Sequence, residues 1–172
     1  KSCFISTPGV KGACLITDLY ERGTQYKAYL QCPHCGAWSP LSFDHMRGPA
    51  GETGAHFVQQ CCGGIIEHKH KARMVTKLLE IDSWVPTFES ENPETPAPPF
   101  VIAKDDLARW TGRDLEGREP SFHIWQAYSL LVSWGKLWSA WEEAQEKPAK
   151  PDGSHRFSIR EILPLSTCSL IM

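Results

Sequence analysis

Two pairs of cysteines constrain this chain more than any other feature of its sequence. The first pair is Cys32 and Cys35, and the second, Cys61 and Cys62, begins after 25 intervening residues. The second cysteine of each pair precedes a glycine, which permits a tight turn that points thiolates at one ion. Zinc takes four ligands in a tetrahedron. The spacing therefore predicts a zinc ribbon, in which two knuckles share one structural Zn²⁺.

The second pair departs from the usual knuckle spacing. A standard knuckle would place a cysteine at position 59, where the chain has Gln59. Cys61 and Cys62 are adjacent, and neighbouring side chains of an extended chain point to opposite faces. They can share one ion only if the backbone turns sharply there, which the following glycines favour. Nearby histidines are the candidate replacement ligands: His56 and His68, and also His34 and His70.

A redox function is the alternative interpretation of the first pair. Cys-Pro-His-Cys is also a motif of thiol oxidants, in which a helix that starts inside the motif depresses a thiol pKa. Pro40 opposes such a helix, and a thiol oxidoreductase would leave the second pair unexplained. We therefore expect structural zinc. The other cysteines have no partner at metal spacing and are interpreted as small buried side chains: Cys3, Cys14 and Cys168.

Composition limits the partners and the compartment. The formal net charge of −2 does not indicate a strongly basic nucleic-acid-binding domain. No apolar run is long enough to span a bilayer, and the first residues lack the apolar region of a signal peptide. Metal-binding cysteines are typical of a reducing compartment. We therefore expect a cytoplasmic protein with no membrane partner.

Hydrophobic periodicity predicts an α+β fold: a small zinc-ribbon-like β module, then amphipathic helices and an irregular tail. Strands are expected at 2–7, with partners upstream, at 13–20 and 25–31 as a hairpin, and at 37–44. Helices are expected at 67–80, 103–110 and 133–147. The corresponding units are 1–12 (a strand and the turn after it), 13–88 (zinc-ribbon module with a basic helix), 89–120 (linker or insertion), 121–150 (Trp-rich helical segment) and 151–172 (irregular tail).

Two surfaces of the expected helices have a candidate function. Lys69, Lys71 and Arg73 concentrate positive charge and are candidate DNA contacts. Because the whole chain is slightly acidic, a solvated helix face is the favoured interpretation. Trp134, Trp138 and Trp141 share one helix face, which is typical of a core and could also be a docking face.

The order of these motifs resembles the large terminase subunit of the GpA family. The resemblance covers residues 4–147 and begins with Phe4-Ile5-Ser6-Thr7-Pro8, which is similar to the end of the family's ATPase core. The cysteine pairs, the basic helix and an aromatic segment that leads into an amphipathic helix follow in the family's order. The chain departs from the family at Gln59, at Leu130 where a proline is usual, in a long 89–120 segment and in the tail.

The resemblance implies a motor that hydrolyses ATP with Mg²⁺ to package phage DNA, and a nuclease that cuts it. It implies as partners the small terminase subunit, the portal and procapsid, and the remaining terminase domains, in the bacterial host cytoplasm. Ser6 and Thr7 would take part in ATPase coupling. This sequence contains no Gly-Lys-Ser/Thr phosphate loop and no acidic nuclease cluster, so no residue is predicted to be catalytic. We expect a fragment that is a zinc-binding connector; an independent zinc-ribbon module for nucleic acid or protein is the alternative.

Overall fold

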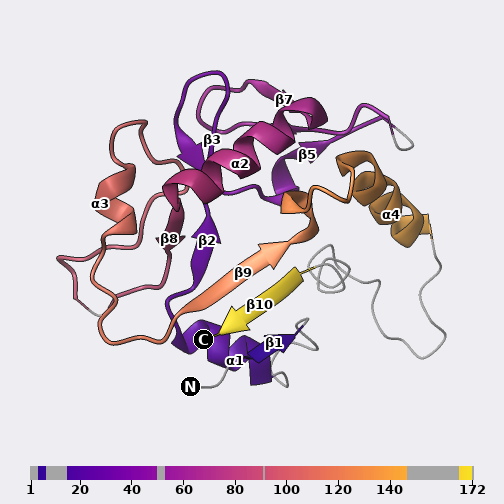
Figure 1. The fold of residues 1–172 in the computed structure, drawn as a ribbon. Coiled ribbons are helices and arrows are strands. Elements are labelled where there is room, and N and C mark those ends of the chain that lie inside the picture. The colour runs from indigo at the N-terminus through magenta and orange to yellow at the C-terminus, as the bar shows by residue number, and fades with distance from the viewer. Residues whose placement is uncertain (1–3, 7–14, 50–52, 91, 147–166, 172) are drawn as a thin grey trace.

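A computed structural model of the chain describes residues 4–6, 15–49, 53–90, 92–146 and 167–171 (Figure 1). Short strands and helices alternate along these residues, and the predicted α+β class is confirmed. The strands are β1 (Phe4–Ser6), β2 (Tyr26–Ala28), β3 (Leu30–Gln31), β4 (Trp38–Ser39), β5 (Met46–Arg47), β6 (His56–Val58), β7 (Ile65–Glu67), β8 (Trp84–Pro86), β9 (Ser121–Trp125) and β10 (Thr167–Ile171). The α-helices are α1 (Leu15–Arg22), α2 (Lys71–Ile81), α3 (Leu107–Thr111) and α4 (Trp134–Glu146), and the 3-10 helices are η1 (Phe43–His45), η2 (His68–His70) and η3 (Gln126–Tyr128).

The strands form one larger sheet and two small ones. The larger sheet has the order β1-β10-β9-β2-β8, with β2 parallel to β9 and the other neighbours antiparallel. β3 pairs with β4, and β5, β6 and β7 form a three-stranded meander. In Figure 1, β3, β5 and β7 of the small sheets lie above the larger sheet, in the part of the molecule that α2 crosses. The two cysteine pairs lie in the hairpin loops of these small sheets.

The segment predicted as a strand at 13–20 is a helix, so the predicted hairpin with 25–31 is wrong. Its described part is α1, which buries Ile16 and half-buries Leu19 and Tyr20. These positions are spaced i, i+3 and i+4, a helical period that a short apolar run does not distinguish from a strand. β2 pairs instead with β8 and β9, which are distant in sequence.

Three strands of the larger sheet were missed or given the wrong partner. β1 pairs with β10, so its partner lies downstream and not upstream as predicted. β10 falls in the segment predicted to be an irregular tail, and residues 147–166 lie outside the described part of the chain. The segment predicted to be helical from residue 121 begins with β9. The aromatic and β-branched residues of β9 suit a strand, and its pairing with two distant strands is invisible to local pattern.

The two stronger helix predictions are confirmed. α2 buries Met74, Val75 and Leu78 of the predicted apolar stripe, whereas Leu79 is exposed. α4 begins directly after Ser133, as predicted, and buries Trp134. The weaker helix prediction at 103–110 corresponds to the single short helix α3. None of these described helices is long and apolar enough to cross a membrane.

The proline-rich stretch after β8 has no helix or strand among its described residues, but it is anchored. The Tyr29 hydroxyl donates to the Pro99 carbonyl at 3.1 Å, and Trp38 forms an isolated β-bridge with Ile102. The Arg113 guanidinium donates to the carbonyls of Phe88 and Thr95, each at 2.8 Å. The contacts of Tyr29 and Trp38 hold the stretch against the first cysteine hairpin, and those of Arg113 join parts of the stretch to one another.

The main core joins the bases of the two cysteine hairpins to the aromatic segment. Phe57 on β6 is 1% exposed, and its ring lies 4.7 Å from that of Trp134 and 6.1 Å from that of Trp125. The indole N–H of Trp134 donates to the Ala127 carbonyl at 3.0 Å. Aromatic pairs of this kind add to the area that they bury. The core therefore fixes where each cysteine hairpin leaves the body of the protein.

Candidate metal centre

The first cysteine pair lies in the six-residue loop that joins β3 to β4. The Cys32 N–H donates to the Ala37 carbonyl at 2.7 Å, and the Gly36 N–H donates to the Cys32 carbonyl at 3.0 Å. Gly36 has a φ of +79°, which favours glycine because a Cβ would be strained there. This is the predicted knuckle turn, and it brings the two thiols to the tip of the hairpin.

The second pair lies in a loop with the same backbone hydrogen bonds. The Gln59 N–H donates to the Gly64 carbonyl at 3.0 Å, and the Gly63 N–H donates to the Gln59 carbonyl at 2.8 Å. Gly63 has a φ of +68°. Gln59 therefore occupies the loop position that Cys32 occupies in the first knuckle. The sharp turn that two adjacent cysteines require is present.

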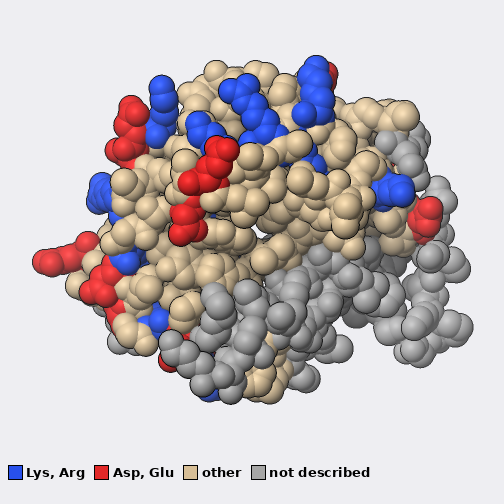
Figure 2. All heavy atoms as spheres, in the orientation of Figure 1, with Lys and Arg blue, Asp and Glu red and all other residues tan. Residues whose placement is uncertain are grey.

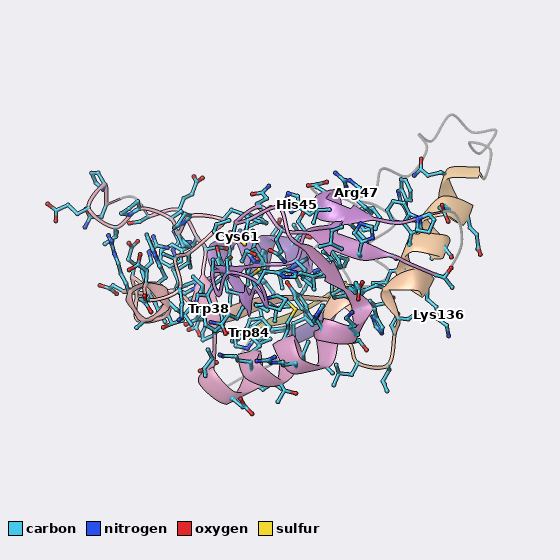
Figure 3. The ribbon with its side chains drawn as sticks, turned by 90° about the horizontal axis from the view of Figure 1, so that it is seen from above. Trp38, His45, Arg47, Cys61, Trp84 and Lys136 are labelled. Atoms are coloured by element: carbon cyan, nitrogen blue, oxygen red, sulfur yellow. The ribbon has the colours of Figure 1, made fainter. Side chains whose placement is uncertain are left out.

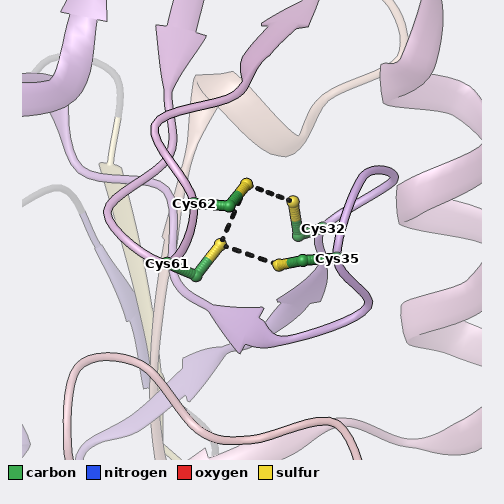
Figure 4. A group of neighbouring side chains, drawn as sticks. All are labelled: Cys32, Cys35, Cys61 and Cys62. Atoms are coloured by element: carbon green, nitrogen blue, oxygen red, sulfur yellow. Dashed lines mark hydrogen bonds between the residues drawn. The ribbon is translucent and has the colours of Figure 1, made fainter.

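The four thiols of the two loops form one cluster (Figure 4). Their Sγ atoms all lie within 4.8 Å of one another. Cys35 Sγ lies 3.3 Å from Cys61 Sγ, and Cys62 Sγ lies 3.8 Å from both Cys32 Sγ and Cys61 Sγ. Four sulfurs at about 2.3 Å from a tetrahedral zinc are separated by about 3.8 Å. The donor set and its spacing fit a four-thiolate zinc ion.

The cluster is buried on one side and open on the other. Cys32 is 2% exposed, whereas Cys35 and Cys62 are exposed. Burial raises the pKa of the Cys32 and Cys61 thiols. The Ala37 backbone N–H is the main cause that lowers the pKa of the Cys35 thiol to about 7. Backbone amides that point at a sulfur stabilise its thiolate, the form that binds metal.

The candidate replacement histidines lie outside this cluster. His56 Nδ1 is 2.8 Å from the Gly54 carbonyl, and His68 Nδ1 accepts the Trp134 N–H at 3.4 Å. His34 points its Nε2 at the Ile65 carbonyl, 2.8 Å away, and His70 lies beside the His34 ring. The metal-capable group in the described residues therefore contains cysteines alone.

Gln59 and Ser39 are parts of the site that spacing alone did not reveal. Gln59 is 6% exposed, and its Oε1 accepts the Ser39 hydroxyl at 2.9 Å. Ser39 lies on β4, so this bond joins the second knuckle to the first hairpin. The available signal was the register of the second loop, in which Gln59 stands three residues before Cys62 as Cys32 stands before Cys35.

The structure separates the three predicted DNA contacts. Lys69 and Arg73 are exposed, and Lys69 forms a surface ion pair with Glu67. Lys71 is 2% exposed, and its ammonium donates to the Val132 carbonyl at 2.6 Å, so it is not a surface contact. Figure 2 shows Lys and Arg side chains gathered over the region of α2. In Figure 3, Trp38 and Trp84 lie beside α2, whereas Lys136 lies on α4 at the edge of the molecule.

Of the remaining predicted residues, the structure describes Ser6 and Cys168, and both belong to strands of the larger sheet. Ser6 ends β1, and Thr7 lies outside the described residues, as do Cys3 and Cys14. Cys168 belongs to β10 in the larger sheet. The described residues thus define the chain as an α+β protein with one four-thiol candidate metal centre.

Comparison with known proteins identifies the relationship. Residues 1–79 match the family model described as phage terminase large subunit gpA, ATPase domain. The chain is 28% identical over 152 residues to the terminase large subunit of Enterobacteria phage P21, and the aligned region covers 86% of this chain and 22% of that protein. It is 25% identical over 155 residues to the terminase large subunit of Escherichia phage lambda, which covers 87% of this chain and 23% of that protein.

The chain is therefore similar to the phage terminase large subunits over most of its length, and the resemblance in its motifs is confirmed. It spans less than a quarter of the length of these two relatives. No solved structure matches the chain.

Proposed function

We propose that this chain is a structural zinc-binding connector of a phage terminase large subunit. The observation that carries the proposal is the four-thiol cluster, whose spacing fits zinc, in a chain similar to these subunits. Cys32 and Cys35 would hold the ion from one hairpin, and Cys61 and Cys62 from the other. Four thiolates leave no open position for a substrate, which is the mark of a structural zinc site.

The connector role follows from what the two hairpins can do. Each small sheet has strands of two or three residues, which are marginal alone. Zinc, when bound, would cross-link the two loops and fix the surface between them. Binding of ATP and Mg²⁺, and cutting of DNA, would belong to other parts of the parent subunit. Ser6 and Thr7 would lie on the ATPase side of the connector.

The partners follow from the same proposal. As part of a terminase large subunit, the connector would act on phage DNA with the small terminase subunit, the portal and procapsid, and the remaining terminase domains. Its compartment would be the bacterial host cytoplasm, which is reducing and keeps thiols available for metal.

Metal content of the reduced protein tests the proposal. We expect one zinc per chain, and expect Cys32→Ser and Cys35→Ser to lose it. His56→Ala and His68→Ala are the matched controls, because their rings lie outside the cluster, and both should keep the ion. A wild-type chain purified reduced with zinc present that holds no ion would refute the connector.

A second candidate is an independent zinc-ribbon module that binds nucleic acid. Lys69 of η2 and Arg73 of α2 support it, because both are exposed in the region where Figure 2 shows Lys and Arg side chains gathered. Duplex DNA binding should then weaken steeply with salt and fall on charge reversal of both residues. Charge reversal of Lys136, which is exposed on α4, is the control and should have little effect. Equal loss in both variants would show that the effect comes from net charge and not from this region.

The thiol oxidoreductase is not favoured. Its chemistry needs a helix that begins inside the Cys-x-x-Cys motif. Here the strand β4 begins three residues after Cys35, and the two thiols face a second pair instead of a helix N-terminus.

A further inference from the structure

We infer that the second knuckle offers two alternative positions for a metal-binding thiol, and that this chain uses the third loop position, Cys61, because Gln59 fills the first. The inference rests on the zinc site proposed above. It concerns which loop positions can supply the fourth ligand, and hence why a knuckle without the usual spacing still completes a four-thiol centre.

The equivalence of the two loops is the first step. Each loop closes with a hydrogen bond from the N–H of its first residue to the carbonyl of its sixth, and another from the N–H of its fifth to the carbonyl of its first. The first positions are Cys32 and Gln59, and the fourth positions are Cys35 and Cys62. Because the backbones match, a thiol at position 59 would start from the same place as Cys32.

The side chain at the third position of each loop is the next observation. In each loop its side chain reaches the other hairpin: His34 Nε2 lies 2.8 Å from the Ile65 carbonyl of β7, and Cys61 Sγ lies 3.3 Å from Cys35 Sγ. A third-position side chain therefore faces the partner knuckle in both loops. In the second loop it is a thiol, and its sulfur lies at ligand spacing from the sulfurs of both Cys35 and Cys62.

Gln59 shows what the first position of the second loop does in this chain. Its side chain is as deeply placed as that of Cys32, with 6% and 2% exposed respectively. A buried amide without a partner is costly, and the Ser39 hydroxyl supplies one at 2.9 Å. The first position thus joins the two hairpins by a hydrogen bond, and the third position joins them through the metal.

Moving the thiol of the second knuckle from position 61 to position 59 tests the inference. Zinc affinity of the 172-residue chain is measured by competition with a chromophoric chelator. Cys61→Ser should lower the affinity by roughly 100-fold, because it removes one of four ligands. The double variant Gln59→Cys, Cys61→Ser should recover to within about 10-fold of wild type, because the second loop then repeats the first. Cys35→Ser is the control for loss of a ligand at an ordinary position.

Each outcome separates this inference from the zinc proposal. A wild type that binds no zinc refutes the proposed function. Zinc that is lost in Cys35→Ser but kept in Cys61→Ser overturns the inference and leaves the zinc site standing. A folded double variant that fails to recover affinity also overturns it, because the two positions would not be interchangeable.

Alkylation of the wild type gives a second measurement that needs no variant to fold. Zinc should protect Cys61 from iodoacetamide as strongly as it protects Cys35, and a chelator should release both together. Cys61 that reacts in the zinc-loaded protein while Cys35 is protected would overturn the inference.

Discussion

The two cysteine hairpins are held by different forces at their tips and at their bases. At the tips, the loops meet through thiols, two of which are exposed, and through two hydrogen bonds, one from Ser39 to Gln59 and one between His34 and the Ile65 carbonyl. At the bases, Phe57 packs between the rings of Trp125 and Trp134 in a buried core. Hydrophobic burial at the bases needs no ligand, whereas the tips offer little apolar area to bury.

The difference indicates which part of the module would depend on the proposed zinc ion. Zinc binding free energy is folding free energy for elements that cannot form alone. The base has a core of its own, so the ion is expected to order the two loops and their mutual surface. The following changes act first on the base and then on the tip, in order of decreasing effect.

Truncation at the base should have the largest effect. Trp134→Ala removes a fully buried ring that contacts Phe57 and hydrogen-bonds to Ala127. We expect a loss of about 3–5 kcal/mol in the free energy of unfolding, with or without zinc. Chemical denaturation followed by circular dichroism measures this. A small loss in the free energy of unfolding that grows only after zinc is removed would show that the tips of the hairpins, and not their bases, supply the stability.

The buried ammonium beside the base should give a pH dependence. Burial lowers the pKa of Lys71 to about 8, below its value in the unfolded chain. The unfolded state therefore binds more protons between about pH 8 and 10.5, and the folded state gains stability as the pH rises through that range. Relative to Lys71→Met, the wild type should gain up to about 3 kcal/mol. Denaturation at several pH values measures the difference, and a constant difference would contradict the assigned burial.

Chelation should separate tip from base most directly. In zinc-loaded protein with free zinc at 100 times Kd, linkage protects the loop amides by about 100-fold. After chelation the amides of residues 32–37 and 59–64 should exchange nearly as fast as in open chain. The amides of β9 should keep the protection that the aromatic core provides. Hydrogen exchange measures both, and loss of all protection in β9 would show that the base also requires metal.

The smallest expected effect is at the hydrogen bond between the knuckles. Ser39→Ala leaves the buried Gln59 amide without its partner and should cost about 1 kcal/mol. Exchange of the second loop should rise several-fold while unfolding of the base changes little. Ser42→Ala is the matched control, because its hydroxyl contacts only an exposed carboxylate, that of Asp44. An equal effect in both variants would contradict a special role for Ser39.

Features that depend on local spacing could be predicted from the sequence. The four thiols stand at knuckle spacing or directly beside it, and the structure gathers all of them. Apolar residues recur at helical spacing in α2, at 74, 75, 78 and 79, and in α4, at 134, 137, 138 and 141, so the prediction of both helices needed no tertiary information.

Features that depend on distant partners could not be predicted. The short apolar run of α1 fits a strand or a helix equally, and tertiary packing decided between them. β10 forms by pairing with β1 and β9, which lie far from it in the sequence. Lys71 was grouped with its charged neighbours, but a carbonyl far along the chain, that of Val132, lies beside it.

The parallel pairing of β2 with β9 has a kinetic consequence. Tyr26 and Phe122 are partners across 96 positions, and both cysteine hairpins lie inside the loop that this pairing closes. Closing a long loop costs chain entropy, which slows the search for non-local contacts. An ion captured early by the two hairpins would shorten the loop that remains to be closed. The proposed zinc ion would then speed the folding of the larger sheet, even where it changes the free energy of unfolding little.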